Sequence, residues 1–182
     1  NIVYKGQRLL YHQNWGDQKV DWSTPKMIKR EKNGDLYLQY WPELDKLKTK
    51  ALVENGSLKL VPRKGMQYGE QDLKKGGKFG DFMLTCDIKI KDAKSVTVVW
   101  RKAFNRRNPK PKYGLKIEPK TGRFSIVEHE HRDFFRSDTH HLYEKDRYTN
   151  KELCKGTIKL RLMVRKSRSE LYINDRWIFN VG

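Results

Sequence analysis

Apolar and polar residues alternate along much of the second half of the chain. From position 82 to 90 every second residue is apolar, namely Phe82, Leu84, Cys86, Ile88 and Ile90. Successive side chains of a strand point to opposite faces, so this pattern predicts a half-buried strand. Shorter stretches at Tyr113–Ile117 and Ile158–Val164 repeat the alternation, whereas Val96–Trp100 is continuously apolar, which is typical of a central strand.

Turn-forming residues separate these stretches at intervals typical of a small β-protein. Asn33–Gly34 predicts a hairpin that ends in the strand Leu36–Tyr40. Gly122 closes a second turn, and Asn174–Asp175 a final hairpin. Residues 43–50 are expected to form one or two helical turns, and Leu58, Leu60 and Val61 a short strand. The pattern predicts an all-β fold, an antiparallel two-sheet β-sandwich of the concanavalin-like jelly-roll kind.

Length and composition agree with one domain that carries an attached segment. The chain has 182 residues, of which 36% are hydrophobic and 12% aromatic. It contains no apolar run of about 18 residues, so no membrane-spanning helix is expected. Cys86 and Cys154 make no disulfide framework. Cys86 lies on the apolar side of its strand and is predicted to be a buried free thiol, although a single Cys86–Cys154 bridge stays open.

The formal net charge of +18 is large and spread along the chain. The densest cationic patch spans positions 101–112 and consists of Arg101, Lys102, Arg106, Arg107, Lys110 and Lys112. Such a patch can bind an acidic glycan, a nucleic acid or an acidic partner. A solvated loop in a basic protein is the simpler interpretation. The sequence shows no aromatic-basic motif of a nucleic-acid-binding fold, so nucleic acid ranks last among the partners considered.

The segment 128–150 interrupts the strand pattern and concentrates unusual residues. Its aromatic side chains are Phe134, Phe135, Tyr143 and Tyr148. One hypothesis makes them a platform on which sugar rings stack. A second, weaker one places a metal on His129 and His131 with His140 or His141. A third has the aromatic rings pack the loop or dock on a neighbouring domain, and this simplest interpretation is favoured. We predict no metal.

Three of the five tryptophans cluster in the first 41 residues. Trp15, Trp22 and Trp41 are predicted to lie at a domain interface, with a glycan subsite as the alternative. Trp100 and Trp177 lie in predicted strands and are expected in the core.

Residues 24–48, TPKMIKREKNGDLYLQYWPELDKLK, run from a Pro-bounded strand through a Gly turn to a Pro-Glu-Leu exit. This order resembles the linker and first strand of the C-terminal β-sandwich domain in glycoside hydrolase family 32, which includes levanases, invertases and fructanases. Later segments match that domain in order: FMLTCDIKI, VVWR, YGLKIEP and ELYINDRWIFN. The resemblance implies that 1–23 end an upstream propeller and that 24–182 form the sandwich.

The family's catalytic motifs are missing from this chain. Its Asn-Asp-Pro, Arg-Asp-Pro and Glu-Cys sequences appear only as near-misses at Asn174–Arg176, Arg132–Phe134 and Glu152–Cys154. The chain alone is therefore expected to be non-catalytic, with no catalytic residue and no cofactor.

The same resemblance implies a set of partners and a location. The main partner is a catalytic propeller in the same polypeptide that hydrolyses fructans or related β-fructosides. The module would shield that propeller, contact oligosaccharide or support a homodimer. A secreted, periplasmic or cell-surface location is implied. Two alternatives stay open: a stand-alone lectin-like carbohydrate-binding module, and a polyanion-binding domain.

Overall fold

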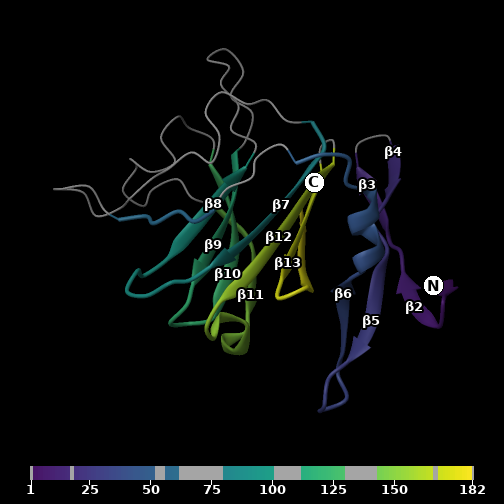
Figure 1. Cartoon of the computed structure of the whole chain (residues 1–182), viewed down its shortest axis with the longest axis horizontal. Coiled ribbons are helices and arrows are strands. Elements are labelled where there is room, and N and C mark those ends of the chain that lie inside the picture. The colour runs from purple at the N-terminus through teal and green to yellow at the C-terminus, as the bar shows by residue number, and fades with distance from the viewer. Residues whose placement is uncertain are drawn as a thin grey trace. The chain divides into compact units, whose positions relative to one another are not determined.

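A computed structural model of the chain describes residues 2–16, 19–51, 56–61, 80–100, 112–129, 143–165 and 168–181. The chain forms two compact units, one made of Asn1–Trp41 and Asp81–Gly182, the other of Pro42–Gly80. The first unit contains all the strands of the described chain, which can be followed in Figure 1.

The larger sheet has eight strands in the spatial order β1-β2-β5-β6-β14-β13-β12-β7. In that order they are β1 (Ile2–Tyr4), β2 (Gln7–Leu10), β5 (Lys26–Arg30), β6 (Leu36–Tyr40), β14 (Arg176–Val181), β13 (Arg168–Ile173), β12 (Ile158–Arg165) and β7 (Phe82–Ile88). All pairings are antiparallel.

The second sheet has four antiparallel strands, and a separate ribbon has two. The four are, in spatial order, β11 (Tyr143–Thr149), β10 (Arg123–His129), β9 (Lys112–Glu118) and β8 (Val96–Trp100). The ribbon pairs β3 (Gln13–Gly16) with β4 (Lys19–Trp22). The prediction of an all-β, antiparallel two-sheet sandwich is confirmed. The prediction that Val96–Trp100 is a central strand is wrong, because β8 lies at the edge of its sheet in the described part of the chain.

Apolar side chains from both sheets meet in one core. The four-stranded sheet contributes Trp100, Tyr113, Leu115, Ile117, Phe124 and Ile126. The large sheet contributes Ile158, Leu160, Leu162, Val164, Leu171, Ile173, Ile178, Phe179 and Val181. All five alternating apolar residues predicted for β7 and its extension pack against this core: Phe82, Leu84, Cys86, Ile88 and Ile90. Trp100 lies in the core as predicted, and its Nε1 donates a 2.9 Å hydrogen bond to Ser169 Oγ, which links the two sheets.

The predicted turns are present. In the loop after β5, Glu31 N donates to Asp35 O at 2.8 Å, and Gly34 has φ +98°. Asn174 and Asp175 both have positive φ, +51° and +62°, as a two-residue turn between β13 and β14 requires.

The described part of the second unit is short. A 3₁₀ helix, η1, runs over Pro42–Leu47, which confirms the predicted helical turn. The predicted strand at Leu58, Leu60 and Val61 is wrong, because 56–61 form no regular element and these three side chains are exposed. In the described part of the chain no strand pairs with residues 56–61.

The N-terminal strands belong to the same sheet as the sandwich strands. β2 pairs with β5, and β5 with β6, within the first unit. The two compact units separate at 41/42 and 80/81. The assignment of 1–23 to an upstream domain stays a prediction.

Gly122 ends the turn between β9 and β10 and offers a sharp test of this packing. It has φ +70°, and an added Cβ would lie 2.6 Å from Lys151 N and Cα. We expect Gly122→Ala to lower the free energy of unfolding by about 2–4 kcal/mol, from left-handed strain and overpacking together. Gly156→Ala is the matched control: its φ is +71°, but nothing lies within 4 Å. Chemical denaturation should give only about 1 kcal/mol there, and equal losses at both positions would contradict the packing described.

Candidate functional site

The face of β13 that points away from the core carries a glutamate and a tyrosine. Leu171 and Ile173 face the core, so Glu170 and Tyr172 project from the opposite side of the sheet. Both are nevertheless buried. The cover comes from residues 23–26, at the start of β5, which contact this face of the sheet. Sequence alternation alone places Glu170 on a solvent-facing side, so this burial is a tertiary effect.

Lys26 and Glu170 form a buried ion pair at the centre of this contact. Lys26 Nζ lies 3.1 Å from Glu170 Oε2, and the lysine side chain is fully buried. Its ammonium also donates to Thr24 O at 3.0 Å and lies 5.5 Å from the ring centroid of Trp177. These neighbours are two oxygen acceptors and the face of an aromatic ring, and all of them favour a cation.

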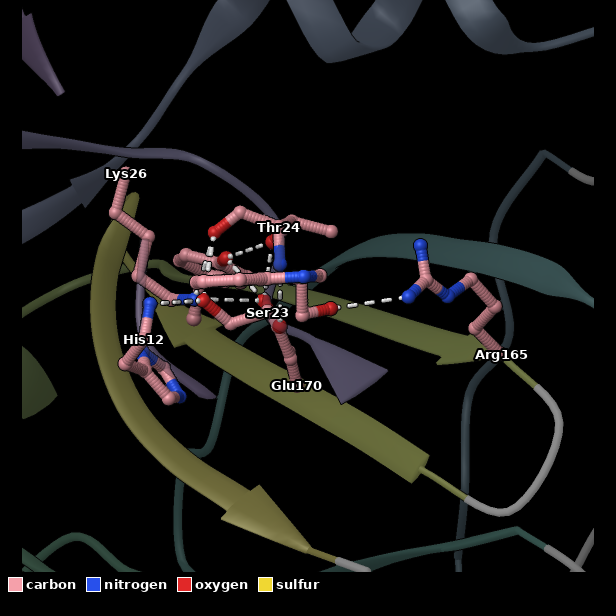
Figure 2. Close-up of polar contacts among 8 residues, drawn as sticks. His12, Ser23, Thr24, Lys26, Arg165 and Glu170 are labelled. Atoms are coloured by element: carbon pink, nitrogen blue, oxygen red, sulfur yellow. Dashed lines mark hydrogen bonds and ion pairs between the residues drawn. The ribbon is translucent and has the colours of Figure 1, made fainter. Parts of the chain in front are cut away.

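The Glu170 carboxylate accepts from several donors. Thr24 N donates to Oε1 at 3.0 Å, and Tyr172 OH donates to Oε2 at 2.7 Å. The Thr24 hydroxyl donates to the same Oε2. Figure 2 shows these contacts converging on Glu170. Both carboxylate oxygens are thus occupied, which suits a structural role better than that of an acid or base that must reach a substrate. We call the group formed by Thr24, Lys26, Glu170 and Tyr172 the clasp.

Charge in this clasp is tuned by burial and pairing. Burial alone raises the pKa of Glu170, but the Lys26 charge and the hydrogen bonds from Thr24 and Tyr172 outweigh it and lower that pKa. Burial lowers the pKa of Lys26, and the attraction of Glu170 partly opposes this shift. The pKa of Tyr172 is raised by burial and by the neighbouring Glu170 charge, so its hydroxyl stays protonated and donates.

Further contacts fasten the chain on either side of Thr24. Ser23 N donates to His12 O at 2.9 Å, and His12 N donates to Ser23 Oγ at 3.0 Å. Arg165, at the end of β12, donates to Trp22 O at 3.0 Å. The His12 ring packs on Trp177, with 5.8 Å between ring centroids. The β3–β4 ribbon lies between His12 and Ser23 in the sequence, so these bonds close its base.

A second cation is buried on the same face of the large sheet. The Arg161 guanidinium carbon lies 3.6 Å from the ring centroid of Tyr40, and its Nη2 is 3.2 Å from Asp175 Oδ1. Tyr40 packs edge-on against Tyr172, with centroids 5.4 Å apart. Its hydroxyl contacts Met83 Sδ on β7 at 3.9 Å. Tyr40 therefore extends the cover across this face.

The candidate ligand site is an open depression of about 600 Å³ at the hairpin turns. It is lined by Arg30, Glu31, Lys32, Asn33, Tyr37, Leu153, Asn174 and Arg176. The turn after β5 supplies one wall and the β13–β14 turn another. The two turns come together at Arg176, which follows the β13–β14 turn, forms an ion pair with Glu31 and lies beside the Tyr37 ring. Leu153 belongs to the 3₁₀ helix η2 (Lys151–Cys154), and its carbonyl accepts from Asn174 Nδ2 at 3.3 Å.

Arg176 lines the depression and contacts several of its neighbours. Its guanidinium carbon lies 4.7 Å from the ring centroid of Tyr37 and 6.0 Å from that of Tyr148. It also forms an ion pair with Glu31. The arrangement holds a planar cation beside two aromatic rings, of which Tyr37 lines the open depression and Tyr148 packs against the core.

Only part of the predicted sugar platform can be placed. Tyr148 is half-buried, packs on Phe124 with 6.5 Å between centroids, and lies beside Arg176. Tyr143 begins β11, but its side chain lies outside the described residues, as do Phe134 and Phe135 entirely. The sugar-binding role of all four stays a prediction.

The other predicted residues lie elsewhere. The anion patch Arg101, Lys102, Arg106, Arg107 and Lys110 is outside the described residues, and of Lys112 only the backbone is described. Of Trp15, too, only the backbone is described. Trp22 is exposed, while Trp41 is half-buried and donates to Gln7 Oε1 at 3.1 Å. Trp177, predicted in the core, is half-buried on the outer face beside Lys26.

The two cysteines are free thiols. Cys86 and Cys154 are both partly buried against the core, and burial raises the pKa of each. In the described part of the chain no group of three His, Cys, Asp or Glu side chains could hold a metal ion. His131, His140 and His141 lie outside that part, and of His129 only the backbone is described. None of the helices in the described ranges has the length and apolarity to cross a bilayer.

The clasp and the depression were both missed by sequence reasoning. Lysine at 26 and arginines at 30 and 176 are ordinary in a chain of charge +18. The available clue was position: Arg30 and Lys32 adjoin the Asn-Gly turn, and Arg176 follows the Asn-Asp turn. Only the contacts of Arg176 with Glu31 and Tyr37 show that these two turns are neighbours.

Comparison with known proteins adds no relative: the chain matches no family model, no curated protein and no solved structure. The structure defines the chain as an antiparallel two-sheet β-sandwich. The resemblance to family 32 rests on its short sequence motifs alone.

The clasp predicts a large stability loss when its carboxylate is removed. Glu170→Ala leaves the Lys26 ammonium buried without its counter-charge, so we expect the free energy of unfolding to fall by about 3–5 kcal/mol. Glu152→Ala is the control, because Glu152 pairs with Lys155 on the surface. That change should cost less than about 1 kcal/mol in the same denaturant titration. A similarly small loss for Glu170→Ala would show that the clasp is dispensable.

The lowered pKa of Glu170 predicts how this stabilisation depends on pH. The unfolded carboxyl titrates near 4.5, and the folded one below it. The contribution of Glu170 is therefore complete above about pH 4.5 and is lost as the pH falls through the folded pKa. Urea titrations of wild type and Glu170→Gln from pH 7 to pH 3 should show the stability gap between them narrowing on acidification. A gap that stays constant would contradict the assignment.

Proposed function

We propose that this chain is a non-catalytic β-sandwich module that binds carbohydrate in the depression between the β5–β6 and β13–β14 turns. The observation that carries the proposal is the Tyr37 ring with the Arg176 guanidinium beside it in an open hollow; Tyr148 adjoins Arg176 but does not line the hollow. Sugar rings present C–H faces that pack on aromatic rings, while their hydroxyls accept hydrogen bonds from a planar cation.

The size and setting of the depression support a short oligosaccharide as ligand. The depression has a volume of about 600 Å³ and is open to solvent, so it would contact one side of a short oligosaccharide. The walls are turns fixed to the sheets: Asn174 N donates to Lys159 O, and Lys159 N to Asn174 Oδ1, each at 2.9 Å. Glu31 N and Gly34 N close the opposite turn. Fixed walls reduce the entropy lost when a ligand binds.

The family resemblance gives this proposal a wider setting. In a family 32-like enzyme the module would accompany a catalytic propeller in the same polypeptide that acts on fructans, outside the cell or in the periplasm. The propeller would supply the chemistry, and this module would contribute stability, dimer contacts or binding of long substrates. Extending the coding sequence upstream tests this setting directly. An upstream region without a propeller and its Asn-Asp-Pro, Arg-Asp-Pro and Glu-Cys motifs would remove it, and the stand-alone lectin-like module would then be preferred.

The binding proposal predicts that Tyr37 is needed for sugar affinity. A glycan array should identify oligosaccharides that bind the chain, and calorimetry on the best of them should show about tenfold weaker binding for Tyr37→Ala, or about 1.4 kcal/mol. The loss arises because one stacking face disappears. Tyr4→Ala is the matched control: Tyr4 is an exposed tyrosine on β1 and does not line the depression. An array without any hit, or equal affinity for both variants, would refute the proposal.

A further inference from the structure

The depression carries more positive than negative charge. Arg30, Lys32 and Arg176 line it, with Glu31 as the one acidic side chain in the lining. Glu31 pairs with Arg176. Within the described ranges, no ion pair joins Arg30 or Lys32 to an acidic side chain. Two cations at the rim therefore have their charge available to a ligand.

Arg30 is exposed and contacts its own turn. Its Nε donates to Gly34 O at 3.3 Å, which directs the guanidinium along the loop that walls the depression. An added Cβ at Gly34 would lie 3.4 Å from Arg30 Nη2, so the side chain packs close to the loop backbone. Lys32 lies in that same loop and is exposed. A guanidinium can bind a carboxylate or sulfate through two parallel hydrogen bonds.

The Glu31–Arg176 pair affects how strongly the depression repels an anion. Because Glu31 is neutralised by Arg176, its repulsion of an incoming anion is reduced. The neutralised Arg176 stays beside Tyr37, where it serves ring stacking. Charge recognition is then left to Arg30 and Lys32, and sugar-face recognition to Tyr37. This separation suits a ligand with both an apolar ring face and an anionic substituent.

We propose that the saccharide bound in this depression is acidic, bearing carboxylate or sulfate groups held by Arg30 and Lys32. This inference rests on the proposed function and names its ligand class. The structure favours a saccharide over a nucleic acid because two turns wall the hollow and an aromatic ring lines it. A nucleic-acid backbone requires a row of phosphate contacts along an extended groove.

The test is calorimetry at low and moderate salt with pairs of oligosaccharides matched in length. One arm compares oligogalacturonate with its methyl ester, and the other compares a heparin-derived oligosaccharide with its desulfated, N-acetylated form. The arm with the larger difference identifies carboxylate or sulfate as the recognised group. The wild-type chain should bind an acidic member at least about tenfold more tightly than its neutralised partner, and added salt should reduce the difference.

Two double variants of equal charge separate the site from the net charge of the protein. Arg30→Ala/Lys32→Ala should abolish the preference for the acidic member and leave binding of the neutral partner within about twofold. Lys91→Ala/Lys94→Ala removes two exposed charges from the loop after β7 and should leave the preference intact. Circular dichroism and the denaturation midpoint establish that each variant is folded.

Each contrary outcome has a distinct meaning. If acidic and neutral members bind equally and both depend on Tyr37, the acidic-ligand inference fails and the proposed function stands. If no saccharide binds, both fail. An equal loss in the two double variants would assign the preference to net charge alone and overturn the inference. Tighter binding of an oligonucleotide of equal charge through Arg30 and Lys32 would overturn it in favour of a nucleic acid.

Discussion

The Lys26–Glu170 pair is the interaction on which the arrangement of the first unit depends. It joins residues near the start of the chain to a strand near its end, on the face of the sheet opposite the core. Transfer of two charges from water into a protein is costly, and the cost is offset only when their hydrogen-bonding capacity is filled. Thr24 and Tyr172 supply those bonds. Removing either charged member leaves the other buried without its counter-charge.

This clasp also bears on the candidate ligand site. β6 and β14 are paired at a single position, Arg176 with Gln39. One further hydrogen bond runs from Tyr40 N to Asp175 O at 2.7 Å. So little pairing would hold the β5–β6 hairpin loosely by itself. The clasp fixes the start of β5, and the packing of Tyr40 on Arg161 and Tyr172 fixes the end of β6. The two turns that line the depression are thereby held together through both strands of the hairpin.

Sequence patterns predicted the sandwich well because its core follows local rules. Period-two alternation identified β7 and β12, and Asn174–Asp175 identified the last hairpin, since each property belongs to a few consecutive residues. The clasp and the depression could not be predicted in this way. Glu170 lies at a position that alternation assigns to solvent, and only the segment 23–26, distant in sequence, buries it. The strand predicted at Leu58 and Leu60 failed for a related reason, because these alternating apolar residues find no strand partner among the described residues.

A polar clasp constrains the register of the N-terminal segment more tightly than an apolar contact would. Apolar side chains can slide against one another with modest loss, because dispersion and burial have little directionality. The Glu170 carboxylate instead requires Thr24 N, the Thr24 hydroxyl and the Lys26 ammonium at fixed places. A shift by one residue would turn Lys26 to the other face of β5 and leave a buried carboxylate without its counter-charge. The same shift would move Arg30 and Tyr37 relative to Arg176, so the geometry of the depression depends on the register that the clasp selects.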